Sequence, residues 1–337
     1  MSAIPKAVLY YSPISIWSAV VLLTIAEKGY GKDELEYRVV DIGKGENFDP
    51  TFLRINPKAT VPTLVVPYEN SLTGGTESRY KALTGTIAAV EFLDKSRSPL
   101  SRTHTTSQAP APALTPATIA GSNVCKTVID DIIHSNEADP NTLRFMNGRN
   151  QEQLQKVAKQ YLGMCQERQA VLKGYLGQAD DGTIKVSDKV KGLWTEKLHQ
   201  TTFLIEVYQE AEKARDQLSE NGKATRDRYV DMAKQVWEAQ LGAVLGRLNK
   251  EISGPYILGD QFSIADLHVA GWLSCLASLV GATGDDSGKA VVDKIEEYVG
   301  NGFKIDKEEN KKSKIEIFWD GLKVRESWKL VYSEGLY

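Results

Sequence analysis

The chain has 337 residues, enough for one or two domains, and its 42% hydrophobic and 25% charged residues are typical of a globular chain with buried cores. A net charge of −3 gives no electrostatic reason to expect a nucleic-acid partner or an anionic membrane, and no apolar run reaches the length of a membrane span. The N-terminus has no secretory pattern, and three widely spaced cysteines (Cys125, Cys165 and Cys275) indicate reduced thiols. We therefore expect a cytoplasmic protein without a disulfide or metal framework.

Residues 7–29 predict a strand, a tight turn and a helix. Ala7 to Tyr11 is an apolar run rich in β-formers, and the helical segment ends at Gly29, which suits a helix C′ position. Ser15 falls at the helix N-terminus, where free backbone N–H groups and the helix dipole stabilise an anion, including a thiolate. Taken alone, Ser15 is more simply explained as an N-cap.

The chain continues with strands at 35–41 and 63–66, separated by a short helix that Pro57 ends. Pro62 must sit at the start of the second of these strands, because proline is poorly placed inside one, and its peptide bond is either cis or trans. A further strand at 80–83 leads into a helix from about Gly85. Thr86 lies at that helix start, and from the residues alone it is an ordinary N-cap.

Residues 95–123 are rich in Pro, Ser, Thr and Ala without periodicity, which predicts a linker or surface loop. The chain is then helical, with one long helix expected over 143–176, a polar break at 178–190 and an amphipathic helix over 226–252. His134 at a helix end is expected to complement the helix dipole, and His268 to be packed or hydrogen-bonded.

Ser263 and Asp266 form the sequence pattern of a capping box. The segment that follows is apolar from Leu267 to Val280, so we expect a helix buried at the centre of its domain.

Three motifs in this order, YYSPIS followed by EKG, NPKATVPTL, and GDQFSIADL, resemble the glutathione transferase superfamily. The resemblance implies an α/β thioredoxin-like N-terminal domain and an all-α C-terminal domain. The corresponding boundaries are residues 1–95, a linker over 96–121, and a helical domain over 122–337 with an insertion at about 178–226.

In that family a serine at the position of Ser15 hydrogen-bonds the glutathione sulfur, so the resemblance implies Ser15 as the catalytic residue. Ser12 and Tyr11 are alternatives in other registers or classes. The resemblance also implies a cis bond before Pro62 and a γ-glutamyl carboxylate held at the start of the helix near Gly85. The implied glutathione contacts are Lys58, Val61, Pro62, Gly85 and Thr86.

Gly85 departs from the family, which has a glutamate there, and this weakens the expected hold on the γ-glutamyl group. Glu77-Ser78 is a literal Glu-Ser pair and the second-ranked alternative for that site. The implied function is conjugation of glutathione to a small apolar electrophile in the cleft between the domains, or reduction of an organic peroxide, by a cytoplasmic homodimer that detoxifies such compounds. The alternative is a non-catalytic binding or regulatory module on the same fold.

Overall fold

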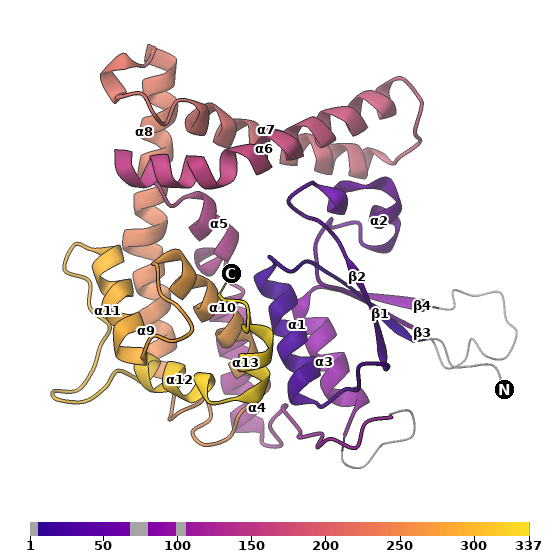
Figure 1. The fold of residues 1–337 in the computed structure, drawn as a ribbon, viewed down its shortest axis with the longest axis vertical. Helices are drawn as coiled ribbons and strands as arrows, with labels where there is room; N and C mark the ends of the chain where they lie inside the picture. The colour runs from indigo at the N-terminus through magenta and orange to yellow at the C-terminus, as the bar shows by residue number, and fades with distance from the viewer. Residues whose placement is uncertain (1–5, 68–79, 99–105, 337) are drawn as a thin grey trace, which may run out of the picture. The chain divides into compact units, whose positions relative to one another are not determined.

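The computed structural model describes residues 6–67, 80–98 and 106–336. The chain forms two compact units (Figure 1). Unit 1 consists of Met1–Val39, Thr60–Pro140 and Gln240–Tyr337, and unit 2 consists of Val40–Ala59 and Asn141–Ala239.

A four-stranded sheet in the order β2-β1-β3-β4 is the β layer of unit 1. Its strands are β1 (Ala7–Tyr11), β2 (Leu35–Val39), β3 (Thr63–Pro67) and β4 (Tyr80–Thr84). β1 is parallel to β2, while β3 is antiparallel to both of its neighbours. Leu9 and Leu64 pair across β1 and β3 and are fully buried, which fixes the register because a one-residue slip would turn both outward. The predicted strands are confirmed, the second being two residues shorter than expected.

Helices α1 (Ile16–Glu27) and α3 (Thr86–Ser96) lie side by side, and α3 contacts β3 and β4 (Figure 1). Gly29 follows α1 with φ +64°, the left-handed conformation expected of a C′ glycine.

A buried ion pair ties these two helices to the segment that follows α3. The Lys28 ammonium lies 2.9 Å from an Asp94 carboxylate oxygen, and the Lys28 side chain is fully buried. Asp94 also accepts hydrogen bonds from Leu114 N–H and from the N–H and hydroxyl of Thr115. Arg97 donates to backbone carbonyls of residues 107, 109 and 110. These contacts attach residues 107–115, which are part of the segment expected to be a linker, to Asp94 and Arg97.

The other helices of unit 1 lie before and after Asn141–Ala239, the larger part of unit 2, in the sequence. They are α4 (Ile119–Lys126), the π-helical η3 (Thr127–Ile133), the 3-10 helix η4 (Asn136–Ala138), α9 (Leu241–Glu251), α10 (Ile264–Leu279), α11 (Gly288–Val299), α12 (Lys314–Lys323) and α13 (Glu326–Val331).

Helix α10 is buried along its length from Ile264 to Ala277, as its apolar sequence predicts. At its start the Asp266 carboxylate accepts hydrogen bonds from both the N–H and the hydroxyl of Ser263, which confirms the capping box. α10 packs against α1 at Gly271, where an added Cβ would lie 2.4 Å from a methyl carbon of Val20. This glycine permits the close approach of the two helices.

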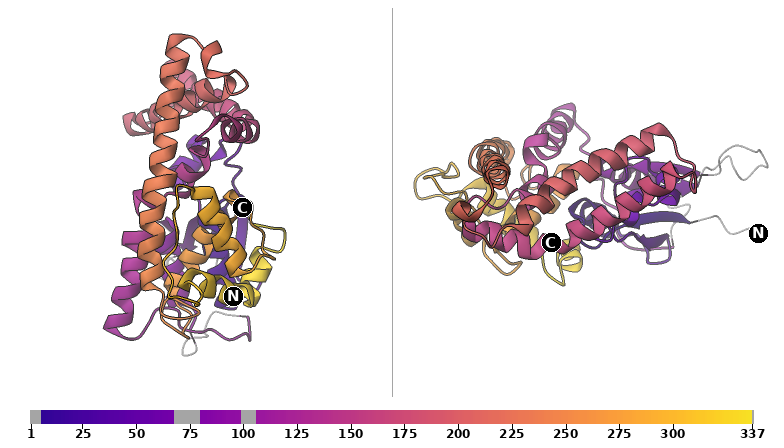
Figure 2. Two further views of the ribbon diagram at one scale, coloured as in Figure 1. Left: turned by 90° about the vertical axis from the view of Figure 1, so that its left-hand side faces the viewer. Right: turned by 90° about the horizontal axis from the view of Figure 1, so that it is seen from above.

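Unit 2 is helical. It contains the 3-10 helix η1 (Glu46–Phe48), α2 (Pro50–Ile55), α6 (Gln151–Asp180), α7 (Asp188–Gln209), the 3-10 helix η5 (Arg215–Gln217) and α8 (Glu220–Lys234). At its edges stand α5 (Pro140–Phe145) and the π-helical η6 (Gln235–Gln240). Figure 2 shows α6 and α7 side by side, joined by a short polar turn. Trp194 on α7 is fully buried and donates through Nε1 to the Phe48 carbonyl at 3.1 Å. Among the described residues, no helix is both long and apolar enough to cross a bilayer.

The structure corrects two helix predictions. The single helix expected over 143–176 is wrong, because α5 ends at Phe145 and α6 begins only at Gln151, capped by the Asn150 side chain. The break coincides with a tight approach, since a Cβ on Gly148 would lie 3.1 Å from the Tyr229 hydroxyl. The helix expected over 226–252 begins earlier, at Glu220, because Ser219 caps it.

Candidate active site

The strand register brings three predicted site segments to one end of the sheet. Tyr10 pairs with Thr63, and Thr63 pairs in turn with Thr84, so these residues form one row across β1, β3 and β4. The turn that leads to Ser15 follows β1, the residue Pro62 precedes β3, and Gly85 follows β4. A hydrogen bond from Gly85 N–H to the Pro62 carbonyl, at 3.4 Å, links two of these segments directly.

Ser15 is the N-cap of α1. Its backbone is extended, and its hydroxyl oxygen accepts a hydrogen bond from Ser18 N–H at 3.2 Å. The turn is closed by two further bonds, from Ser15 N–H to the Ser12 carbonyl and from Ser12 N–H to the Ser18 hydroxyl oxygen. Ser18 was not singled out from the sequence, since nothing in its spacing marks it as part of the turn.

The capping role leaves the Ser15 hydroxyl proton available. A serine hydroxyl has one donor and two lone pairs, and the Ser18 N–H occupies only one lone pair. Among the residues described by the structure, the Ser15 hydroxyl donates to no acceptor. The side chain therefore holds the helix start in place and keeps a proton for an external acceptor.

The peptide bond between Val61 and Pro62 is cis, which confirms the prediction. Within the described part of the chain, neither the N–H nor the C=O of Val61 has a hydrogen-bond partner. An unpaired backbone donor and acceptor on one residue can pair with an extended peptide in the manner of a strand edge.

Gly85 is the N-cap of α3, with φ +108°, and Thr86 is the first helical residue. The alternative of Thr86 as an ordinary N-cap is therefore wrong. Gly85 has no side chain to cap the helix, so the first amides of α3 have no side-chain cap. The positive φ favours glycine over a residue with a Cβ. The Thr86 side chain is buried and, within the described ranges, makes no hydrogen bond.

The remaining predicted residues fall at other places. Lys58 belongs to unit 2, is exposed, and donates its N–H to the Asn56 side chain. The strand register of unit 1 therefore does not place Lys58 with the other predicted residues. Tyr11 ends β1, and its ring meets Tyr37 edge-to-face at 6.1 Å. Ser12 is 2% exposed. The alternative pair Glu77-Ser78 lies outside the described residues.

The position of His134 at a helix end predicted a cation that complements the helix dipole, and this prediction is wrong. His134 is the C-cap residue that follows η3. Its ring is stacked on Trp17, and its Nε2 lies 2.8 Å from Nδ1 of His268. Burial lowers the pKa of His134 to about 4, so the ring is neutral at physiological pH. The expectation that His268 is packed and hydrogen-bonded is confirmed, since it is fully buried in this pair.

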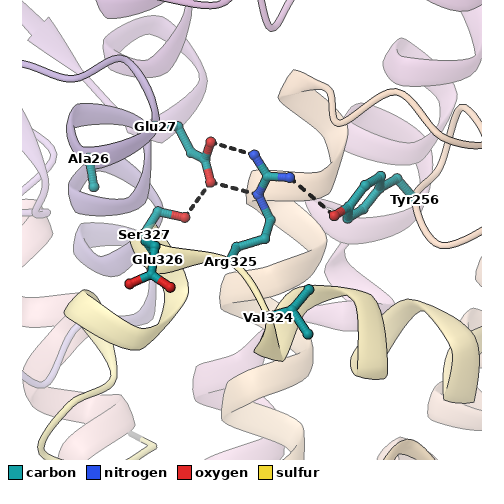
Figure 3. A pocket seen from close by; sticks show the side chains of 7 residues that line it. All are labelled: Ala26, Glu27, Tyr256, Val324, Arg325, Glu326 and Ser327. Carbon is teal, nitrogen blue, oxygen red and sulfur yellow. Dashed lines mark hydrogen bonds and ion pairs between the residues drawn. The ribbon is translucent and has the colours of Figure 1, made fainter. Parts of the chain in front are cut away.

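A cavity of about 390 Å³ lies at the other end of α1 (Figure 3). Its charged groups satisfy one another: Glu27 accepts from Arg325 Nε at 2.7 Å and Nη2 at 2.6 Å, and also from the Ser327 hydroxyl. Arg325 also donates to the Tyr256 hydroxyl and lies 3.8 Å from the centroid of the Phe262 ring. The contacts of Arg325 and Ser327 with Glu27 thus fasten α13 to α1, and we assign them a structural role.

No group of three or more potential metal ligands occurs among the residues that the structure describes. The three cysteines are free and buried, and none lies in the segments that surround Ser15.

Two family models match the chain. The model of the glutathione S-transferase N-terminal domain matches residues 9–80, and that of the glutathione S-transferase C-terminal domain matches residues 198–296. The chain belongs to the glutathione transferase superfamily. Its fold is the one expected: a thioredoxin-like α/β part at the N-terminus followed by a mostly helical region.

Known proteins similar to this superfamily member include a curated relative and several solved structures. Over 63 residues it is 44% identical to the tetrachloro-p-hydroquinone reductive dehalogenase of Sphingobium chlorophenolicum, a segment that covers 18% of this chain and only 24% of that protein. The β-etherase LigF from Sphingobium sp. strain SYK-6 is similar in structure, with a TM-score of 0.50, 15% identity, and 98% and 100% of the two chains covered. Glutathione transferase Omega 3C from Trametes versicolor gives a TM-score of 0.47 and 16% identity, covering 98% and 85%.

Proposed function

We propose that this protein is a serine-type glutathione transferase, which conjugates the glutathione thiolate to a hydrophobic electrophile or reduces organic peroxides with it. The observation that carries the proposal is the free donor of Ser15 at the start of α1. It lies at the same end of the sheet as the start of α3 and as the backbone of Val61, which is unpaired among the residues that the structure describes. Superfamily membership supports the same ligand.

The cysteine and γ-glutamyl parts of glutathione have matching groups in this arrangement. The cysteine backbone pairs with the N–H and C=O of Val61, next to Pro62. The γ-glutamyl carboxylate sits at the first amides of α3 with the hydroxyl of Thr86, since a helix N-terminus favours an anion. Gly85 supplies no side chain here, and Lys58 is a proposed contact on the family resemblance alone.

Ser15 acts on the sulfur. A free thiol has a pKa of about 8.5, and lowering it by about two units requires roughly 2.7 kcal/mol. A hydroxyl that donates to a charged acceptor supplies about 1.5–3 kcal/mol, and the helix terminus adds about 0.3–1 kcal/mol. The two together are sufficient to make the thiolate the main species near neutral pH.

The reaction needs no further protein acid or base. In conjugation the thiolate attacks the electrophilic carbon, the carbon–sulfur bond forms, and the leaving group departs with its electron pair. In peroxide reduction the thiolate attacks a peroxide oxygen and releases the alcohol, and a second glutathione then reduces the sulfenic intermediate to give glutathione disulfide and water. We further propose a cytoplasmic homodimer that acts in detoxification, with no metal, nucleic-acid or membrane partner.

A binding module without catalysis is the second candidate, and the absence of a side chain at Gly85 favours it. Retention on glutathione–agarose followed by conjugation of chlorodinitrobenzene separates the two. We expect retention and turnover in the wild type, and a loss of turnover in Ser15→Ala that neither Ser12→Ala nor Tyr11→Phe reproduces. Retention without turnover supports the binding module. Turnover that survives Ser15→Ala but not one of the other two substitutions would transfer the catalytic role to that residue.

A further inference from the structure

Three rings from distant parts of unit 1 form a cluster. Trp17 lies in the first turn of α1, His134 is the C-cap residue that follows η3, and His268 lies in the first turns of α10. The Trp17 and His134 rings are stacked, with centroids 4.2 Å apart and planes at 22°. The His134 and His268 rings meet edge-on, joined by the 2.8 Å contact between Nε2 and Nδ1.

The cluster adjoins the N-terminal half of α1, where Ser15 is the cap. Trp17 is two residues beyond Ser15 in the same helical turn. One turn after His268, Gly271 of α10 meets α1 at Ile16 and Val20. Trp17 and His134 are both partly exposed, whereas His268 is fully buried beneath them.

The burial of His268 favours one placement of the protons on the two rings. Its Nε2 is buried and, among the described residues, has no hydrogen-bond partner. If His134 Nε2–H were the donor, His268 would keep its proton on Nε2, as a buried N–H without an acceptor. If His268 Nδ1–H is the donor, that Nε2 is instead a bare lone pair. Orphaned buried N–H groups are rare in proteins, so we take the second arrangement, which leaves no such N–H on His268.

In this arrangement His134 accepts at Nε2 and, being neutral, carries its proton on Nδ1. That N–H makes no hydrogen bond with any residue that the structure describes. Stacking on Trp17 and the bond from His268 fix the ring, so the donor is held in place. A fixed neutral imidazole is a competent donor to an oxygen on which negative charge develops.

We propose that His134 donates its Nδ1–H to the electrophile, and that this selects conjugated carbonyl compounds such as enones and quinones. The proposal rests on the function proposed above. When the thiolate adds to an enone, the carbon–sulfur bond forms at the β-carbon and the π electrons move to the carbonyl oxygen. His134 hydrogen-bonds that enolate oxygen, and water then protonates the enolate to the saturated adduct. His268 is a positioning residue that sets the tautomer of His134.

The tautomer is tested first, by a measurement that does not depend on activity. The chain has four histidines, and long-range ¹H–¹⁵N correlation of the ¹⁵N-histidine-labelled protein distinguishes protonated from bare ring nitrogens. The spectrum of His134→Asn assigns the His134 signals by their loss. We expect a protonated Nδ1 and a bare Nε2 for His134 at neutral pH. A protonated Nε2, or a cationic ring, overturns the proposal.

Substrate selectivity is tested with an enone and with an alkyl halide that has no acceptor oxygen. His134→Phe keeps a ring against Trp17 but removes the donor, so we expect kcat/KM to fall about tenfold for the enone and to change less than about twofold for the halide. His134→Asn retains a donor and should recover part of the enone activity. His199→Phe, at an exposed histidine of α7, is the matched control and should leave both rates unchanged.

An equal loss for both substrates in His134→Phe and in His134→Asn indicates a packing role and overturns the proposal. Turnover of neither substrate by the wild type refutes the proposed function, and with it this role, even if the spectrum gives the expected tautomer. Turnover of both with unchanged selectivity in His134→Phe refutes the role of His134 alone.

Discussion

The strongest test of the proposed chemistry is the pKa of the glutathione thiol bound to variants at Ser15. The Ser15 oxygen accepts from Ser18 N–H at 3.2 Å, so Ser15→Ala removes an N-cap as well as the donor to sulfur. Loss of the cap costs about 1 kcal/mol of folding stability. Loss of a donor to a charged sulfur costs about 1.5–3 kcal/mol, which raises the thiol pKa by about 1–2 units. The thiolate absorbs in the ultraviolet, so titration of the bound complex measures this pKa directly.

Two further substitutions separate the cap from the donor. Ser15→Thr keeps both functions and should leave the thiol pKa within about half a unit of the wild-type value. Ser15→Asp keeps the cap, because aspartate is an equally good N-cap, but places a negative charge beside the sulfur. We expect its thiol pKa to exceed that of Ser15→Ala while its stability matches the wild type. A thiol pKa that is the same in wild type and Ser15→Ala would refute the role of Ser15.

Two predictions concern the frame around the site. Asp94→Asn should lower the free energy of unfolding by about 3–5 kcal/mol, because it removes the negative charge that pairs with the buried Lys28 ammonium. The control is Glu91→Gln, in an exposed ion pair on the same helix, which should lower it by less than about 0.5 kcal/mol. Burial raises the pKa of Asp94, but its hydrogen bonds lower the pKa by more, so the net pKa lies below 3.8. The stabilisation from Asp94 is therefore fully present above pH 3.8 and is lost as the pH falls through the lower pKa of the folded state. Urea unfolding at neutral and acid pH measures the stability loss in Asp94→Asn and its pH dependence. A loss in Asp94→Asn as small as that in Glu91→Gln would contradict a stabilising role of the buried ion pair. Gly271→Ala should cost about 1–3 kcal/mol through overpacking against α1, while Gly177→Ala, at an open position of α6, should gain up to about 1 kcal/mol; equal effects would exclude close helix packing as the cause.

The sequence predicted the strand, helix and capping elements of unit 1 well, because their signals are local. The strand at 7–11, the helix that Ser15 caps and the capping box of α10 each depend on a few adjacent residues. The cis bond before Pro62 was left open by the residues alone and was implied by the family resemblance. The register that aligns them follows from strands whose buried faces permit only one pairing.

The helix boundaries that the sequence missed depend on tertiary contacts. The apolar spacing continues through the break between α5 and α6, so periodicity alone predicted one helix. The space at Gly148 is filled by Leu154 and by the hydroxyl of Tyr229, about eighty residues further along the chain. No local pattern announces such a contact.

The two sides of the proposed reaction therefore differ in how far the sequence can reveal them. Glutathione is the same ligand in each reaction that we propose, and most of the groups proposed to bind it lie on segments that a single row of the sheet aligns. In our proposal the electrophile is bound by His134, whose partner His268 is 134 residues away and whose stacking partner is on α1. Each of these residues reads from the sequence as an ordinary core or helix-end position. Only their assembly gives the imidazole a fixed tautomer, and a fixed tautomer is what turns a packed ring into a directional donor.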